Sequence, residues 1–255
     1  MSLTFVTDPA FYAVAVPAVI LAGFSKAGLG GAVGSLSVPL MALAIAPSQA
    51  LAIMLPILLL MDAMGLVAFR GRFDAAILRI AVPAGLVGIA VGWLLFRHLD
   101  ARWIRALIGT EAVIFALQKL LEGAAAWRGP PVPLRRGPAL FWSALSGFTS
   151  FVSHAGGPPM MQLMMPLKLR HEIFVGTLAW FFAAINFSKI LPYAQLGLLD
   201  PANLGTSLLL IPAVPVGYLL GLRFLKRVSP GVFVRVASVG LLLTGVKLLW
   251  DAFAA

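Results

Sequence analysis

Cysteine is absent from this 255-residue chain, and charged residues are scarce. Without cysteine there can be no disulfide framework, no thiolate metal ligand and no cysteine nucleophile. Charged residues make up 11% of the chain, where a soluble domain has about 25%, and 61% of the residues are apolar. Nineteen basic and nine acidic residues cannot coat a soluble globule of this length. The composition therefore predicts an all-α polytopic membrane protein whose apolar surface faces lipid.

The sequence also lacks the common signatures of enzymes and of nucleic-acid-binding proteins. It has no Walker loop and no His-Glu-x-x-His motif. Ser153 and His154 are adjacent, whereas a nucleophile and its base need facing side chains. The net charge is +10, but the basic residues are scattered at the ends of apolar segments, as they are in cytoplasmic loops. We expect no enzymatic activity, no cofactor, no metal site and no nucleic-acid partner.

Long apolar runs, separated by polar residues, account for most of the chain. A membrane helix needs about 20 apolar residues to cross the hydrocarbon layer. The runs are continuous rather than alternating, so the strands of a lipid-facing barrel are not expected. Ten apolar segments result, at residues 9–26, 31–46, 48–69, 75–96, 102–122, 137–153, 157–167, 172–193, 201–225 and 231–253.

The order of these segments repeats within the chain. Gly71-Arg72-Phe73-Asp74 lies 126 residues before Gly197-Leu198-Leu199-Asp200, and each motif precedes a long segment. Gly23-Phe24-Ser25 and Gly147-Phe148-Thr149 each come shortly before a Gly-Gly pair. We therefore divide the chain into a first transmembrane repeat (1–126), an exposed linker rich in proline and arginine (127–137) and a second repeat (138–255).

Five segments in each repeat predict that the second repeat is inverted. If the ten segments alternate, 13 lysines and arginines fall on one side of the membrane and 3 on the other. The positive-inside rule places the 13 in the cytoplasm and both termini outside it. Inverted repeats are a common plan for secondary transporters. Four true spans in each half would instead make the halves parallel, and this alternative stays open.

Two segments are too short to be ordinary spans. His154 to Pro166 covers 13 residues, about 20 Å as a helix, and residues 31–46 contain Pro39. Each segment follows a Gly-Gly pair, which predicts half-helices or re-entrant segments at matching places in the two repeats. Such pairs indicate a binding site near the middle of the membrane. The alternative is that the glycines only allow close helix packing.

With these motifs the sequence resembles the TauE/SafE family of sulfite and organosulfonate exporters. The resemblance depends on the run from Gly23 to Gly31, with Pro39 following, and on Gly147-Phe148-Thr149 leading to His154-Ala155-Gly156-Gly157-Pro158. Ser153-His154 departs from the family, which often has a small residue or glycine there. The resemblance implies export of small sulfur-containing anions across the bacterial inner membrane. An anion channel is the alternative, because glycine-bounded half-helices also build selectivity filters.

The glycine loops are suited to an anion. A helix N-terminus leaves four N–H groups unpaired and carries about half a positive charge, and glycine lets a ligand approach the backbone. If the repeats face each other, two such ends point at one cavity. The candidate anion-binding glycines are Gly30, Gly31, Gly156 and Gly157.

Ionisable and polar residues within the apolar segments complete the candidate site. Ser25 and Lys26 stand at the first glycine loop, and Asn186 and Lys189 share a helix face in the eighth segment. Snorkelling of Lys26 to the interface, or helix–helix adhesion by the Asn186–Lys189 pair, would explain these residues equally well.

Three further polar residues are candidates. His154 could bind the anion or take up a proton, or simply be a hydrogen-bonded interior histidine. Asp62 is interpreted as the only acid deep in an apolar run, where it could pair with a lysine or carry a proton. Gln162 could donate hydrogen bonds to the ligand or serve packing. The expected partners are the lipid bilayer and a small anion; the sequence leaves the substrate, the coupling ion and the oligomeric state open, with a homodimer among the alternatives.

Overall fold

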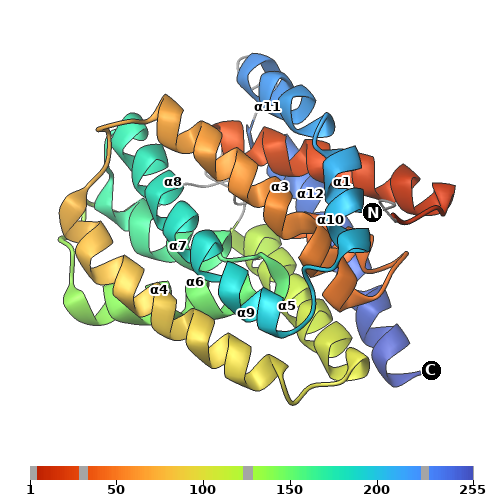
Figure 1. The fold of residues 1–255 in the computed structure, drawn as a ribbon. Coiled ribbons are helices and arrows are strands. Elements are labelled where there is room, and N and C mark those ends of the chain that lie inside the picture. The colour runs from red at the N-terminus through yellow and green to blue at the C-terminus, as the bar shows by residue number, and fades with distance from the viewer. Residues whose placement is uncertain (1–4, 29–33, 123–128, 225–229, 255) are drawn as a thin grey trace.

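The computed structural model describes residues 5–28, 34–122, 129–224 and 230–254, and their regular structure is entirely helical (Figure 1). The helices are α1 (Pro9–Gly28), η1 (Gly34–Leu36), α2 (Ser37–Met41), α3 (Pro47–Ala68), α4 (Ala75–Phe96), α5 (Ala101–Glu122), α6 (Arg136–Ser153), α7 (Gly157–Met164), η2 (Met165–Leu167), α8 (His171–Ser188), α9 (Ile190–Gln195), α10 (Pro201–Leu210), α11 (Ala213–Phe224) and α12 (Pro230–Phe253).

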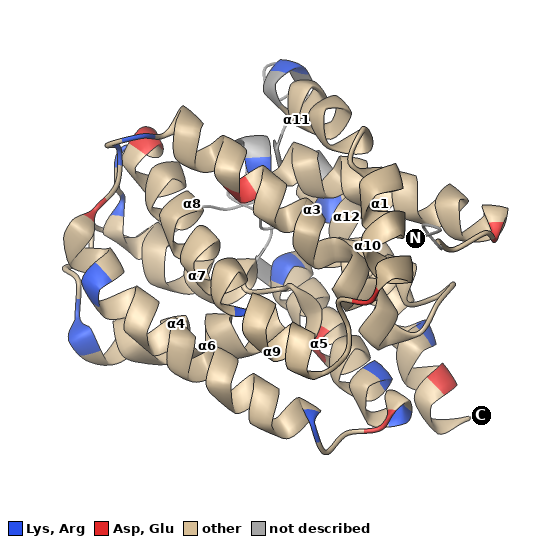
Figure 2. Cartoon of the chain, viewed as in Figure 1, with Lys and Arg blue, Asp and Glu red and all other residues tan. Residues whose placement is uncertain are grey.

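Five helical stretches in the described residues are long and apolar enough to cross a membrane, or six if the bent pair α10–α11 is one span. This arrangement makes the chain a multi-pass membrane protein. Charged residues lie mostly at helix ends and in loops, and the helices between them are largely uncharged (Figure 2). The helix α5 is as long as α3 and α4, but Arg102, Arg105, Glu111 and Lys119 make it too polar to count among the candidate spans. The spans counted in this way do not confirm a ten-segment repeat.

Two predicted segments are each broken in the structure. The segment at 201–225 divides into α10 and α11, which are bent by 44°. Pro212 stands in the break, and proline lacks the N–H of a helical bond. The segment at 172–193 divides at Lys189, between α8 and α9. Pro192 lies three residues later and cannot donate the N–H that would continue the ladder of α8.

The predicted short segments are also short in the structure. Helix α7 has 8 residues, which is about 12 Å, and η2 adds three. In the segment predicted at 31–46, the described helical residues are Gly34–Met41. The N–H of Val132, in the linker, donates to the carbonyl oxygen of Pro166 at 3.0 Å. This contact brings the start of α6 beside the end of η2, so α6 and α7 form a hairpin that returns to the side from which it came.

The chain also doubles back after α1. Ser37, the first residue of α2, donates its hydroxyl to the carbonyl oxygen of Ala18 in the middle of α1 at 3.0 Å. The N–H of Gly34 donates to Ser25 Oγ at 3.1 Å. Residues 29–33, which join the two arms in the sequence, lie outside the described residues. Both predicted short segments therefore return along the helix that precedes them.

Backbone features recur at the spacing of the sequence repeat. Gly71 and Gly197 both have positive φ, at 72° and 69°, which glycine adopts without strain. Each is followed three residues later by an aspartate that caps the next helix. Asp74 accepts the N–H groups of residues 76 and 77, and Asp200 those of residues 202 and 203. The matching sequence motifs therefore build the same turn and the same helix start twice.

Glycines also place the backbones of paired helices in close contact. A Cβ added to Gly88 of α4 would lie 1.9 Å from the carbonyl oxygen of Ala144 in α6. A Cβ added to Gly217 of α11 would lie 2.3 Å from that of Ile20 in α1. Helices α3 and α8 pack against each other, as do α5 and α12. In the order of the sequence repeat, α1 with α11 corresponds to α6 with α4.

Candidate functional site

The starts of the two short segments line one small interior cavity. Its volume is about 30 Å³, which is room for a few water molecules. Gly34 begins η1, and Gly157 begins α7, so backbone from both hairpins reaches this space. Helices α1, α3, α6 and α8 supply the rest of the wall. The lining residues are Ala22, Lys26, Gly34, Leu58, Ser150, His154, Gly157, Phe182 and Asn186.

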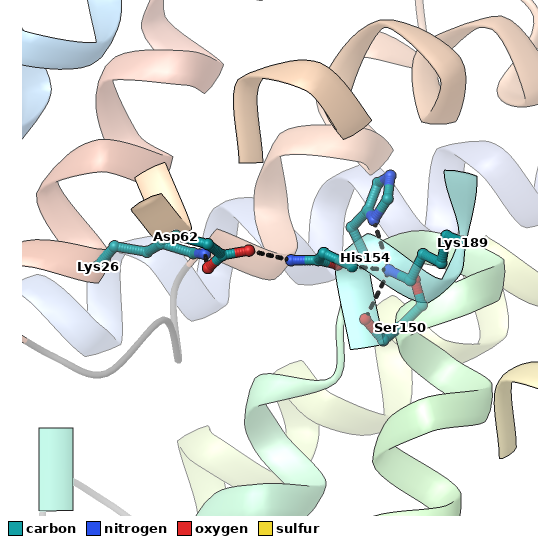
Figure 3. Close-up of polar contacts among 6 residues, drawn as sticks. Lys26, Asp62, Ser150, His154 and Lys189 are labelled. Carbon is teal, nitrogen blue, oxygen red and sulfur yellow. Dashed lines mark hydrogen bonds and ion pairs between the residues drawn. The ribbon is translucent and has the colours of Figure 1, made fainter. Parts of the chain in front are cut away.

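An ion pair between Lys26 and Asp62 forms one end of a polar network beside this cavity (Figure 3). Lys26 comes from the last turn of α1, and Asp62 from α3, where its side chain is only 3% exposed. The second carboxylate oxygen of Asp62 accepts a hydrogen bond from Asn186 Nδ2 at 2.6 Å. Asp62 is therefore satisfied by a lysine on one oxygen and by an amide on the other.

Lys189 forms the other end of the network, and its side chain is fully buried. Its amine contacts Asn186 Oδ1 at 2.8 Å, Ser150 O at 2.6 Å and Ser150 Oγ at 2.7 Å, and His154 Nδ1 at 3.0 Å. A lysine at the junction of α8 and α9 reaches the network because the helix breaks there. Asn186 thus bridges the two charged residues: its Nδ2 donates to Asp62, and its Oδ1 accepts from Lys189.

The contacts of His154 assign its tautomer. Nε2 lies 3.1 Å from the carbonyl oxygen of Leu51, which can only accept a hydrogen bond, so this nitrogen carries the proton. Nδ1 is then free to accept from the amine of Lys189. His154 also caps α6 in the left-handed region, with φ of 55°, a conformation that costs a non-glycine residue about 1 kcal/mol or more. The polar contacts hold the residue in this strained backbone.

Hydroxyl groups of α6 hold the tip of its hairpin. Ser146 Oγ donates to the carbonyl oxygen of Gly156 at 2.6 Å, and Thr149 Oγ1 donates to that of Ala155 at 3.2 Å. A Cβ on Gly156 would lie 2.7 Å from the carbonyl oxygen of Ser146, so only glycine fits there. These hydroxyl contacts add to the backbone bond from the N–H of Met160 to the carbonyl oxygen of Gly156, and they fix the tip beside the cavity.

A second cavity of about 30 Å³ lies between α1, α3, α8 and α11. Lys26 and Phe182 line both cavities. The Nζ atom of Lys26 lies 5.9 Å from the centre of the Phe182 ring. The Lys26–Asp62 pair and the Phe182 ring therefore stand between the two spaces. The second cavity is lined by Lys26, Met61, Asp62, Gly65, Phe69, Val175, Leu178, Ala179, Phe182 and Tyr218.

A family model described as sulfite exporter TauE/SafE matches residues 15–248, nearly the whole chain. The chain belongs to the TauE/SafE family of sulfite exporters. The match spans both hairpins, the linker and every residue of the network, so it confirms the resemblance drawn from the two glycine loops. TauE/SafE is a family of transporters, which favours transport over enzymatic catalysis for this chain. No curated protein and no solved structure matches the chain in the corresponding comparisons.

Most of the site residues predicted from the sequence lie close together in the structure. Lys26, Asn186 and His154 line the cavity, as does Gly157, and Asp62 and Lys189 join them through hydrogen bonds. Ser25 is buried beside the cavity, where it accepts the N–H of Gly34. Gly156 serves the hairpin tip, and Gln162 of α7 is not among the lining residues. Gly30 and Gly31 lie outside the described residues.

Two site residues were missed by the sequence interpretation. Ser150 holds Lys189 through two contacts, and it follows Gly147-Phe148-Thr149 as Lys26 follows Gly23-Phe24-Ser25, so the repeat alignment pointed to it. Glu111, in the middle of α5, has a buried carboxyl oxygen and a hydrogen bond to Ser153. The interpretation of Asp62 as the only acid deep in an apolar run was therefore wrong. A count of acids in every segment would have found Glu111.

Proposed function

We propose that the protein is a secondary transporter that exports small sulfur-containing anions, sulfite or organosulfonates, across the bacterial inner membrane. The observation that supports this proposal best is the network of Lys26, Asp62, Asn186 and Lys189, which lies at a cavity reached by both short segments. Two amines oppose one carboxylate in the network. With both amines protonated, the site carries one surplus positive charge in surroundings where charge is poorly screened.

An oxyanion has a defined place to bind in this arrangement. Lys26 is the cavity-lining amine, and a sulfite or sulfonate oxygen would replace the carboxylate of Asp62 as its partner. Asn186, which now donates to Asp62, can donate to the anion instead. At the start of α7, Pro158 and Pro159 have no N–H, so the donor there is the N–H of Gly157, supported by the positive end of the helix dipole. The pair of Lys26 and Asp62 would then open as the anion binds and re-form as it leaves.

Alternating access between inverted halves is the proposed mechanism. The twin turns at Gly71 and Gly197, the twin glycine crossings and the two hairpins support an inverted repeat. In that arrangement the hairpins enter from opposite sides of the membrane and meet at the cavity. The second cavity, beyond Lys26 and Phe182, would lead toward the cytoplasm, because α3 ends close to Arg70 and Arg72. Movement of Phe182 and of the ion pair would connect the two cavities.

The topology gives a first prediction. Cysteines placed at Arg102 and at Arg135 in this naturally cysteine-free chain should react with membrane-impermeant maleimide from opposite sides, with residue 135 cytoplasmic. Both side chains are exposed, and neither forms an ion pair among the described residues. Labelling of spheroplasts and of inverted vesicles gives the two readings. Labelling of both positions from the same side would remove the inverted repeat.

Flux in proteoliposomes separates a transporter from an anion channel. A transporter should carry ³⁵S-sulfite with saturable kinetics and accelerate when unlabelled sulfite is present on the opposite side. A channel should instead show conductance in planar bilayers and no such acceleration. Equal rates in empty liposomes and in proteoliposomes would contradict export of sulfite by this protein. A conductance without saturation would favour the channel.

Gly157→Leu should abolish this flux while the protein still inserts and purifies as one species. The added side chain would occupy the cavity that Gly157 lines and would keep an anion from the first turn of α7. The matched control is Gly137→Leu, at the exposed start of α6, where a Cβ meets nothing within 4 Å. Sulfite flux and gel-filtration profiles of the two variants are the measurements. Normal flux through Gly157→Leu would mean that the anion does not use this helix start.

A further inference from the structure

Glu111 is a half-buried acid with a carboxyl oxygen shielded from solvent, and the anion site described above does not use it. It lies in the middle of α5, and its Oε2 is hydrogen-bonded to Ser153 Oγ. Its Oε1 is shielded from solvent and has no hydrogen-bond partner in the part of the chain that the structure describes. A carboxyl oxygen that is shielded from solvent and has no partner is costly to keep ionised. The group is placed to exchange a proton rather than to pair permanently with a base.

The hydrogen bonds of Ser153 fit both protonation states of Glu111. The Ser153 hydroxyl lies within reach of Glu111 Oε2 and of the carbonyl oxygen of Thr149, at 3.1 Å, but it has only one proton to donate. When Glu111 is ionised, Ser153 donates to the carboxylate. When Glu111 is protonated, the acid donates to Ser153 and the serine donates to Thr149. A proton can therefore arrive or leave without breaking the contact.

Glu111 is connected to the anion site through the next residue. Ser153 precedes His154, whose ring accepts from Lys189, and Lys189 interacts electrostatically with Glu111. Among the other charged groups on the helices packed against α5, Arg235 of α12 and Arg136 of α6 are exposed. Lys247 and Asp251 of α12 pair with each other, and Asp62 of α3 pairs with Lys26. Lys189 is thus the charged residue through which Glu111 acts on the anion.

We propose that Glu111 binds the proton that is coupled to anion transport. The inference rests on the proposed function and names its coupling ion. With both lysines protonated and Glu111 ionised, the charges of Lys26, Lys189, Asp62 and Glu111 sum to zero. With Glu111 protonated, they sum to plus one, which a monoanion neutralises. The proton and the anion therefore strengthen each other's binding, as linkage requires, and they leave together as a neutral pair driven by the outward gradient of the anion.

Proton uptake during anion binding tests this coupling directly. The probe is methanesulfonate, whose charge is constant near neutral pH, added to purified protein in weakly buffered detergent solution with a pH indicator. Wild type should take up protons as the anion binds, and Glu111→Gln, which mimics the protonated acid, should reduce the uptake at least tenfold. The matched control is Glu172→Gln, which removes an exposed glutamate paired with Arg72 and should behave as wild type. Undiminished uptake by Glu111→Gln would overturn the proposal.

A pH titration followed by infrared spectroscopy detects the protonation of Glu111 directly. It does not measure transport, and it does not depend on the folding of a single variant. The carbonyl band of a protonated carboxylic acid should be present in wild type, disappear as the pH rises, and be missing from Glu111→Gln. Ser153→Ala retains the acid but removes its hydrogen-bond partner, so it should shift the frequency and the midpoint of this band. If wild type binds neither methanesulfonate nor sulfite, the proposed function fails while the band still supports Glu111 as a proton site. Identical bands in wild type and in both variants would overturn the inference and leave the proposed function standing.

Discussion

Lys26→Gln should weaken the binding of sulfite by roughly 5- to 150-fold, which corresponds to the 1–3 kcal/mol typical of a hydrogen bond to a charged group. Lys26 lines the cavity, and its amine is paired with Asp62, so the bound anion would take over that ionic contact. Glutamine keeps the length and polarity but removes the charge. Lys26→Arg should be intermediate, because the charge remains while the compact ammonium becomes a planar guanidinium.

Asp62→Asn should have the opposite effect on the affinity for sulfite. The substitution removes the carboxylate that competes with the anion for Lys26, so sulfite should bind more tightly while flux falls, since the ion pair can no longer re-form as the anion leaves. The matched control for Lys26→Gln is Lys168→Gln, which removes a positive charge at the exposed end of η2. Titration calorimetry with sulfite at two salt concentrations gives the affinities. Normal binding by Lys26→Gln would show that this lysine only pairs with Asp62, and the anion site would then depend on Lys189, His154 and the helix starts.

Gly88→Ala should cause a large loss of stability. The new Cβ would lie 1.9 Å from the carbonyl oxygen of Ala144 and 2.7 Å from the N atom of Phe148, both in the backbone of α6. Backbone cannot move aside as the end of a side chain can, so α4 and α6 must separate. We expect a loss of about 3 kcal/mol or more, at or above the usual cost of overpacking. Thermal melting of the purified protein in detergent measures the effect.

Gly217→Ala is the twin of this variant in the second repeat and should also lower the melting temperature, because its Cβ would lie 2.3 Å from the carbonyl oxygen of Ile20. Gly240→Ala in α12 is the matched control, since the nearest atom to its Cβ would be 3.9 Å away. That control should be neutral or slightly stabilising, because alanine favours a helix over glycine by about 1 kcal/mol. Equal melting temperatures for Gly88→Ala and Gly240→Ala would mean that the close glycine crossing does not hold α4 against α6.

The sequence predicted the positions of the helices well where local chemistry alone decides them. Asp74 and Asp200 cap their helices because an aspartate side chain can accept the free N–H groups of the first turn, and this needs no distant partner. The shortness of α7 followed from the Gly-Gly pair before it and Pro166 behind it. The bend between α10 and α11 was missed, because apolar residues continue across Pro212 and hydropathy does not register a kink.

The candidate site was predictable in its members but not in its contacts. Polar residues in apolar segments are rare, so Lys26, Asp62 and Lys189 stood out. Their pairing depends on where α1, α3 and α8 cross, which a single sequence does not specify. The sequence analysis offered pairing with a lysine as one interpretation of Asp62, but it did not identify Lys26 as that partner. Ser150 was not predicted as a site residue because a serine carries no charge, although it supplies two of the contacts of Lys189.

A crystal structure with bound selenite would test the central claim most directly. Selenite has the charge and the pyramidal shape of sulfite, and its selenium gives an anomalous signal that identifies it among other atoms. We expect one anomalous peak in the cavity lined by Gly34 and Gly157, about 3–4 Å from the amine of Lys26, with Asp62 displaced from that amine. Selenite bound only outside this cavity, with the Lys26–Asp62 pair intact, would contradict the account.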